Sequence, residues 1–347
     1  ERENFLASDI SAIIEHTRKV IYLNDFELVK ITNSNVEICD FRGTQKPLEV
    51  KEINWNLEQA QKQGYKHFML KEIFEQPQIF EDSFKVPVEI KKDLSRITIV
   101  ACGTAYYAGL VGRYIIEKIA KIPVIAEVAS EFRYKELLID KDDLVIAISQ
   151  SGETADTLAA VKLAKQKGAR TLGIINVVNS TIAREVDEII YTRAGPEIGV
   201  ASTKAFMAQL IILYKLAFYL SKKELNLNSF AENLIQVLSL NEEIKLLAQK
   251  YYRYQNFLYI GRNLNYPLAL EGALKLKEIS YIHAEAYPAG ELKHGPISLV
   301  SEEVPTFAIC PQDAVYEKTL SNVQEIKARN GKVIALATKG DERIKTI

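Results

Sequence analysis

The stretch VIAISQSGETADTL at residues 145–158 decides the fold of this 347-residue chain. An apolar run passes into a hydroxyl-rich segment and then into a helical one, the pattern of a buried strand joined by a loop to a helix. In doubly wound sheets such a loop lies at the carboxyl edge, where ligands bind. The stretch therefore predicts a parallel α/β fold with a ligand site at this loop.

Further apolar runs alternate with helical stretches along the chain, which indicates parallel βαβ units. They lie at 97–100, 144–148, 172–175, 257–260, 305–309 and 333–337. The last three form a series similar to the first three, so we predict two copies of one doubly wound unit. The second series contains too few strands for a complete sheet, and we expect it to be incomplete at its C-terminal end.

Residues 1–48 alternate short β-like runs, at 20–23 and 36–38, with Asn, Asp and Gly turns. This alternation predicts a small β meander, which Pro47 closes. The charged segment that follows, 49–90, is interpreted as a connector.

A helix is expected in this connector at 69–76, where Pro77 stops it. The predicted organisation is a β-rich tail, the connector and two doubly wound domains, at 1–48, 49–90, 91–235 and 236–347.

Composition excludes several classes of protein. Lys plus Arg total 44 against 45 for Asp plus Glu, and the net charge of −1 offers no broad attraction for nucleic acid or an anionic membrane. Three cysteines without CxxC spacing argue against a disulfide framework or a zinc site and favour the reducing cytosol. We expect a cytoplasmic protein without a metal, a cofactor, a nucleic-acid partner or a membrane partner.

No signal peptide is visible at the N-terminal residues. The apolar window 206–220 is interrupted by Gln209 and Lys215, and it is shorter than the roughly 20 residues of a membrane span. We therefore expect a buried helix there.

Ser149, Ser151 and Thr154 can each donate a hydroxyl hydrogen bond, and the free N–H groups at the start of the next helix favour an anion. The loop lacks the lysine of nucleotide-binding loops and the GxGxxG of dinucleotide folds, which favours a monophosphate. The alternative is ordinary helix capping, worth about 1 kcal/mol. Because one hydroxyl suffices for a cap, the three together favour a phosphate cradle.

Two further loops follow this pattern. Thr104 lies in the loop 101–105 and would add a donor at the same sheet edge if the strands at 97–100 and 144–148 are neighbours. The alternative is that this loop is a simple strand-to-helix turn built on Gly103. Ser202, in the loop 197–204, is placed to cap the predicted buried helix.

Residues 271, 275, 278 and 282 fall on one face of a predicted helix. A carboxylate on this face could serve as a general base beside the Lys275 ammonium, provided that the face lines a cleft. The alternative is a solvent-side row of ion pairs, worth about 0.2–0.5 kcal/mol per pair.

His294 lies in a Gly- and Pro-flanked loop at 287–296. An imidazole exchanges protons near neutral pH, so this residue is a candidate acid or base. The alternative is a simply exposed histidine.

Three segments carry a family resemblance: SQSGETADT at 149–157, EIGVASTKAF at 197–206 and the run 271–296, joined by ENFLASD at 3–9. Together they closely resemble the glutamine–fructose-6-phosphate aminotransferases, also called glucosamine-6-phosphate synthases, over essentially the whole chain. The resemblance implies two sugar isomerase (SIS) domains behind the closing part of a glutaminase domain. It implies transfer of the glutamine amide nitrogen, as ammonia, to fructose-6-phosphate and isomerisation to glucosamine-6-phosphate, the first step of hexosamine synthesis.

By this resemblance, each candidate residue acquires a role. Residues implied to hold the phosphate are Thr104, Ala105, Ser149, Gln150, Ser151 and Thr154. Residues implied to line the sugar chain are Val200 and Ser202. Three residues are implied in catalysis. Glu278 would be the base that moves a proton between C1 and C2, and Lys275 would be an assisting group. His294 would be the ring-opening acid or base. The family's histidine loop comes from the neighbouring subunit, which implies a homodimer.

Three departures from the family pattern bear on function. Position 105 is Ala where the family commonly has Ser, so one phosphate hydroxyl is absent. The chain has no N-terminal cysteine, which is the family's glutamine-hydrolysing nucleophile, and lacks the family's C-terminal tail with its Schiff-base lysine. We therefore expect the glutamine site to lie outside this sequence and the chain by itself to be inactive.

Two other functions share the predicted phosphate loop. One is a non-catalytic SIS sensor of a sugar phosphate, although no basic helix-turn-helix segment is visible. The other is a double-SIS deglycase or isomerase of amino-sugar phosphates, which needs no glutaminase domain. The glutaminase-like tail at 1–48 favours the aminotransferase over both.

Overall fold

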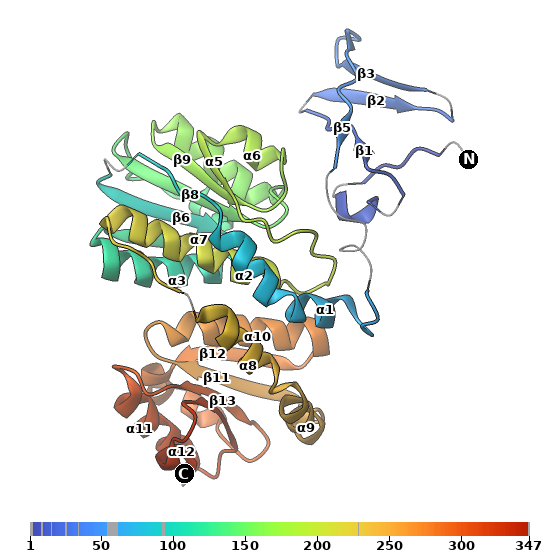
Figure 1. Ribbon diagram of the computed structural model, residues 1–347. Coiled ribbons are helices and arrows are strands. Elements are labelled where there is room, and N and C mark those ends of the chain that lie inside the picture. Colours follow the sequence, from blue (N-terminus) through green and yellow to red (C-terminus); the bar gives the residue numbers. More distant parts are fainter. Residues whose placement is uncertain are drawn as a thin grey trace. The chain divides into compact units, whose positions relative to one another are not determined.

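The computed structural model describes residues 3–7, 10–14, 16–24, 26–33, 35–53, 62–91, 94–227 and 229–345. Contacts divide the chain into two compact units, whose elements Figure 1 shows in sequence colours. One unit comprises Glu1–Lys71 and Gly195–Gly199, and the other comprises Glu72–Ala194 and Val200–Ile347.

The N-terminal unit contains the expected antiparallel meander, which follows a 3-10 turn, η1 (Ile10–Ala12). Its strands are β2 (Glu27–Ile31), β3 (Val36–Asp40) and β4 (Gln45–Lys46). The strand expected at 20–23 is wrong in extent, because β1 covers only Lys19–Val20. β1 pairs with β5 (Lys51–Glu52), so the β structure continues beyond Pro47.

Two short helices follow, α1 (Phe68–Phe74) and α2 (Gln76–Phe84). The helix expected at 69–76 corresponds to α1, which ends earlier than predicted. Pro77 lies in the first turn of α2, where its missing N–H would have no helical partner in any case. The proline therefore belongs to the start of a second helix that the sequence pattern does not reveal.

The first sheet has five parallel strands in the order β10-β9-β8-β6-β7. They are β6 (Arg96–Ala101), β7 (Val124–Val128), β8 (Asp143–Ser149), β9 (Arg170–Ile175) and β10 (Glu188–Tyr191). The three expected runs are confirmed as β6, β8 and β9. β7 and β10 escape the pattern because they are edge strands, and each places a glutamate within a short apolar run.

Alternate side chains of the central strand β8 point to opposite faces of this sheet, as the period of a strand requires. Leu144, Ile146 and Ile148 join one core cluster, while Val145 and Ala147 join another. The helices of this domain are α3 (Gly103–Ala120), α4 (Ala129–Phe132), α5 (Ala155–Gln166), α6 (Thr181–Glu185) and α7 (Lys204–Ser221). Every residue of β8 is buried, so packing holds the residue at which the following loop begins in one position.

The apolar window at 206–220 is confirmed as part of the buried helix α7. Within the described part of the chain, α7 is the one helix whose length and composition would permit a membrane crossing, and half of it is buried in the fold. Core helices pass the same test, and α7 packs against α2 and α3. Its Lys215 ammonium donates to the carbonyl oxygens of Phe84 and Val86.

The second sheet has four parallel strands in the order β12-β11-β13-β14. They are β11 (Asn256–Gly261), β12 (His283–Pro288), β13 (Thr306–Cys310) and β14 (Val333–Ala337). The three expected runs are confirmed as β11, β13 and β14. The helices and 3-10 turns are α8 (Phe230–Leu238), α9 (Asn241–Tyr251), α10 (Asn265–Ser280), η3 (Ala289–His294), η4 (Pro296–Leu299), α11 (Tyr316–Lys327) and α12 (Glu342–Lys345).

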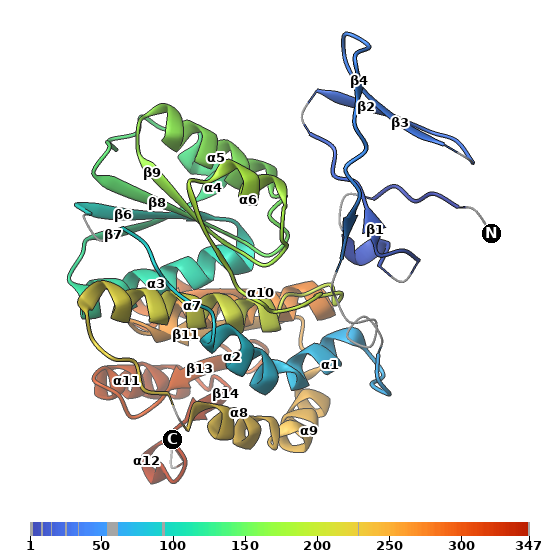
Figure 2. The same ribbon diagram turned by 45° about the horizontal axis from the view of Figure 1, so that its top comes forward.

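α10 lies where the two parallel-sheet domains meet. It packs on β11 and β12 of its own sheet and against α3 of the first domain. Both views show α10 on the side of the second sheet that faces α3 and α7 (Figures 1 and 2). Side chains of the second domain can therefore reach the start of α3.

Candidate functional site

A hollow of about 220 Å³ lies at the carboxyl edge of the first sheet. The loops after β6 and β8 share this edge because the two strands are hydrogen-bonded neighbours. The hollow is lined by Cys102, Thr104, Ala105, Ile148, Ser149, Gln150, Ser151, Thr154, Ser202 and Gln209. The structure thus brings together every residue expected to hold the sugar phosphate except Val200.

The loop after β8 folds around its own hydroxyl groups. Ser149 Oγ accepts a hydrogen bond from Gly152 N at 2.9 Å and lies 3.2 Å from Thr154 Oγ1. Ser151 Oγ accepts one from Glu153 N at 3.2 Å. An accepting hydroxyl still has its own proton to donate, so Ser151 and one member of the Ser149–Thr154 pair can donate to a ligand. Thr154 is also the N-cap residue of α5, which places that helix N-terminus at the hollow.

Gly152 allows this loop to turn tightly. Its φ of +69° lies in the left-handed region that favours glycine. A Cβ at this position would lie 1.9 Å from Ser180 Oγ, and Ser180 is fully buried. The loop therefore has no room for a side chain at this point.

The loop before α7 differs from its predicted arrangement. The N-cap position of α7 is Thr203, one residue after Ser202, and Ser202 lines the hollow. Val200 is 95% exposed and is not part of the lining. The structure therefore brings Ser202, but not Val200, to the other candidate residues.

Gln209 lines the hollow although no motif points to it. This α7 residue is 2% exposed, and within the described residues its Oε1 has no hydrogen-bond partner. A buried amide without a partner costs free energy, which a ligand or a water molecule at the hollow would recover. The signal in the sequence is the polar interruption of the apolar window at 206–220.

A row of charged side chains on α10 meets the hollow at Thr104. Lys275 Nζ lies 3.3 Å from Glu271 Oε1 and 2.6 Å from Glu278 Oε2. Thr104 Oγ1 lies 3.1 Å from Glu271 Oε1 and 3.0 Å from Lys275 Nζ. The alternative of a solvent-side row is therefore wrong at the Glu271 end, which contacts α3.

Burial distinguishes the two carboxylates of this row. Glu271 is 7% exposed, and this burial raises the pKa of its carboxyl group, while the Lys275 ammonium acts to lower it. The Glu278 side chain is 35% exposed, so a ligand can reach it. The expectation that residue 282 shares this face is wrong, because α10 ends at Ser280.

His294 is exposed and is not among the residues that line the hollow. It ends η3, which packs against α11 in the second domain. The loop expected at 287–296 is in fact the end of β12 followed by 3-10 turns. Within one chain, the structure does not bring His294 to the other candidate residues.

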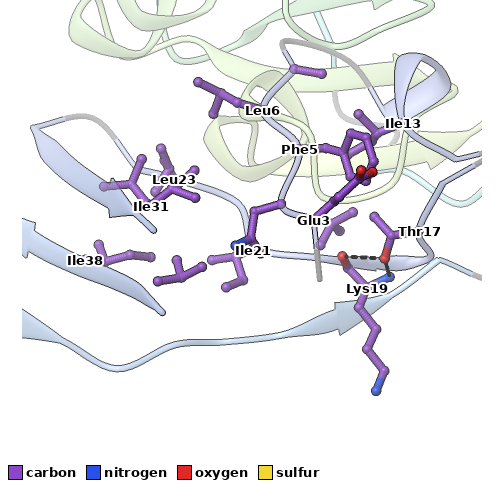
Figure 3. A pocket seen from close by; sticks show the side chains of 15 residues that line it. Glu3, Phe5, Leu6, Ile13, Thr17, Lys19, Ile21, Leu23, Ile31 and Ile38 are labelled. Carbon is purple, nitrogen blue, oxygen red and sulfur yellow. Dashed lines mark hydrogen bonds between the residues drawn. The ribbon is translucent and has the colours of Figure 1, made fainter. Parts of the chain in front are cut away.

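A second cavity, of about 290 Å³, lies within the N-terminal unit. Figure 3 shows aliphatic side chains around it, including those of Leu6, Ile31 and Ile38. Thr17 and Lys19 form hydrogen bonds with each other in its wall. A mainly aliphatic lining offers few donors to an anion, so the hydroxyl-lined hollow is the better candidate for a phosphate.

The SIS domain family model matches residues 90–219 and 250–346. These ranges contain both the hydroxyl-lined hollow and the charged row of α10. The chain belongs to the SIS domain family.

Curated relatives refine this assignment. Glutamine–fructose-6-phosphate aminotransferase (isomerizing) from Aquifex aeolicus is 52% identical over 358 residues, which cover 100% of this chain and 60% of that protein. The protein of the same name from Chlorobaculum tepidum is 48% identical over 372 residues, which cover 99% of this chain and 61% of that protein. The chain thus spans about 60% of the length of the curated relatives that it matches.

Solved structures with similar folds include one that bears the same family name as these relatives and one that bears another. The C-terminal domain of glucosamine-fructose-6-phosphate aminotransferase from Francisella tularensis is 44% identical with a TM-score of 0.75, covering 81% of this chain and 86% of that one. A glucosamine-6-phosphate deaminase from Thermotoga maritima is 25% identical with a TM-score of 0.66, covering 80% of this chain and 86% of that one. Within the SIS family, the chain groups with the glutamine–fructose-6-phosphate aminotransferases.

Proposed function

We propose that this chain provides the sugar-phosphate site of an enzyme that transfers the amide nitrogen of glutamine, as ammonia, to fructose-6-phosphate and isomerises it to glucosamine-6-phosphate. The observation that carries the proposal is that the hydroxyl-lined hollow meets the charged row of α10, with Thr104 Oγ1 3.0 Å from Lys275 Nζ. The reaction needs both features. The phosphate anchors the sugar in one orientation, and a base moves a proton between neighbouring carbons.

In this proposal, the phosphate lies against the loop after β8 and the N-terminus of α5, where Ser149, Gln150, Ser151 and Thr154 hold it. Ser202 lines the sugar chain from the loop before α7. Gln209 supplies a further polar contact from α7. The buried strand β8 supports this arrangement, because it fixes the start of the loop.

Glu278 is the proposed base that takes the proton from C1 and returns it to C2. It is the more exposed carboxylate of the charged row, and its contact with Lys275 at 2.6 Å holds it in place. Acid–base chemistry of this kind needs no cofactor.

His294 is the proposed ring-opening acid or base, and it would act in the site of a second subunit. Its exposure and its absence from the hollow of its own chain support a homodimer in which each chain completes its partner's site. Val200, which is also exposed, would contact the sugar only in that assembly. The proposed enzyme acts in the cytosol and hydrolyses glutamine at a separate site.

A second candidate is an enzyme that acts on an amino-sugar phosphate without glutamine. The similarity to the deaminase structure from Thermotoga maritima favours it, but the identity is 25% against 52% for the aminotransferase from Aquifex aeolicus. The two candidates share the hollow and the base. They differ in the nitrogen donor.

The test is an assay of the full-length protein with fructose-6-phosphate and either glutamine or ammonia. Formation of glucosamine-6-phosphate from glutamine would support the proposed function. Deamination of glucosamine-6-phosphate with no use of glutamine would favour the second candidate. Binding of either sugar phosphate without turnover would favour a sensor.

A further inference from the structure

The protons of the charged row can be assigned from its hydrogen-bonding groups. A lysine ammonium has three N–H donors and accepts nothing. Three acceptors lie within reach of Lys275 Nζ: Glu278 Oε2 at 2.6 Å, Thr104 Oγ1 at 3.0 Å and Glu271 Oε1 at 3.3 Å. The ammonium therefore donates a hydrogen bond to Thr104 Oγ1 and forms ion pairs with the two carboxylates.

The hydroxyl group of Thr104 then has a partner for both its lone pair and its proton. Because Lys275 Nζ can only donate, Thr104 Oγ1 accepts from it. The single hydroxyl proton of Thr104 points elsewhere, and the carboxylate oxygen Glu271 Oε1 lies 3.1 Å away to receive it. The hydroxyl thus accepts from one neighbour and donates to the other.

This assignment leaves Thr104 no proton for a phosphate. A phosphate needs donors, and an oxygen that offers only a lone pair repels it. The loop after β8 and the N-terminus of α5 provide donors without Thr104. Thr104 lines the hollow, but its hydroxyl serves the charged row.

We infer that Thr104 is a positioning residue, whose hydroxyl holds the Lys275 ammonium between Glu271 and Glu278 and so orients the base. The inference rests on the proposed function and adds to it, since it assigns Thr104 to the base, whereas the family resemblance implied a phosphate contact. Without the hydroxyl, the ammonium loses one of three partners and is free to shift along the row. Glu278 is then no longer held in one orientation.

Substitutions at residue 104 in the full-length protein test this inference. Thr104→Val keeps the shape and removes the hydroxyl, while Thr104→Ser keeps the hydroxyl. Ser149→Ala serves as the reference for a lost phosphate contact. Calorimetry with glucosamine-6-phosphate gives the affinity, and steady-state kinetics with fructose-6-phosphate give kcat.

We expect Thr104→Val to lower kcat by about tenfold or more while the affinity stays within about threefold, and Thr104→Ser to restore kcat. Ser149→Ala should show the reverse pattern. A weaker affinity in Thr104→Val with unchanged kcat would make Thr104 a phosphate ligand and overturn the inference. If both the affinity and kcat of Thr104→Val are unchanged, the contact between Thr104 and Lys275 has only a structural role, and the inference is also overturned.

A replacement variant and a control on the parent protein complete the experiment. If the valine chain does not fold, as judged by thermal unfolding, Thr104→Cys replaces it, because a thiol is only a weak donor and a weak acceptor. The same loss of kcat with retained affinity is expected. A parent protein that neither binds nor converts the sugar phosphates would contradict the proposed function itself, which is a different outcome from either pattern at residue 104.

Discussion

Thr104 and Lys275 are separated by 171 positions in the sequence, yet their Oγ1 and Nζ atoms lie 3.0 Å apart. The contact joins α3 of the first domain to α10 of the second. It places a row of acid–base groups beside a hollow suited to a phosphate. Neither domain has both features by itself.

The phosphate contacts can be tested by calorimetry with glucosamine-6-phosphate. Ser149→Ala and Thr154→Ala each break the pair from which one hydroxyl donates to the charged ligand. Loss of that hydrogen bond is worth about 1.5–3 kcal/mol, or roughly 10- to 150-fold in affinity, and we expect it in at least one of the two variants. The matched control is Ser221→Ala, whose hydroxyl donates to Phe218 O at the far end of α7. Unchanged affinity in both hollow variants would place the phosphate elsewhere.

Gln209→Leu tests the buried amide of α7. Leucine keeps much of the volume but removes the polar group, so we expect the affinity for glucosamine-6-phosphate to fall by roughly threefold to tenfold, as for one neutral hydrogen bond. The free protein should be no less stable, because an amide without a partner is removed from the core. Lower stability with unchanged affinity would contradict a role in binding.

Glu278→Gln tests the proposed base in the full-length protein. A neutral amide cannot accept the C1 proton, so isomerisation should fall by about 10²–10⁴-fold while binding stays within about threefold. Glu317→Gln is the control, since that carboxylate pairs with Arg343 on the surface. Activity of Glu278→Gln near that of the parent would move the role of base to another group.

The raised pKa of Glu271 predicts how stability depends on pH. Because burial raises its pKa in the folded state above the ordinary value of 4.5, its contribution to stability is complete below 4.5 and is lost as the pH rises through the folded pKa. Gln at this position does not titrate. The melting temperature of Glu271→Gln minus that of the parent should therefore increase from pH 4 to pH 7. A difference that is constant or decreases would show that burial does not govern this carboxyl group.

The proposed homodimer can be tested by mixing two impaired proteins at a fructose-6-phosphate concentration too low to fill the Ser149→Ala site. A His294→Ala chain and a Ser149→Ala chain, each of full length, should regain activity when their subunits exchange, because one mixed site then has both residues. Mass measurement of the dimers confirms the exchange. No gain in activity after confirmed exchange would place His294 in the site of its own subunit.

Much of the fold follows from the sequence because buried strands leave a clear apolar pattern. β6, β8, β9, β11, β13 and β14 all lie where apolar runs predict them. The edge strands β7, β10 and β12 escape the pattern because each contains a glutamate, which an edge strand tolerates, whereas the edge strand β14 is apolar throughout. Helix ends are also harder to predict, as the end of α10 at Ser280 shows.

The parts of the candidate site that lie in one sequence motif can be predicted from the sequence. The parts that depend on tertiary packing cannot. The hydroxyl loop at 149–154 is visible in the sequence as a cluster of one residue type. The contact between Thr104 and α10 is not, because it depends on how two helices from different domains pack. The same holds for Gln209, which local sequence marks only as a polar interruption in an apolar helix.

Gly152 has a consequence for how this protein can vary. Its left-handed backbone and the 1.9 Å approach of Ser180 to a Cβ built there leave no space for any side chain. Every single-nucleotide change that alters a glycine codon without stopping translation introduces a residue with a Cβ. Apart from synonymous changes, the codon for residue 152 therefore has no neighbour that keeps the loop intact, and in a random mutant library selected for the proposed activity residue 152 should remain glycine even where the residues around it change.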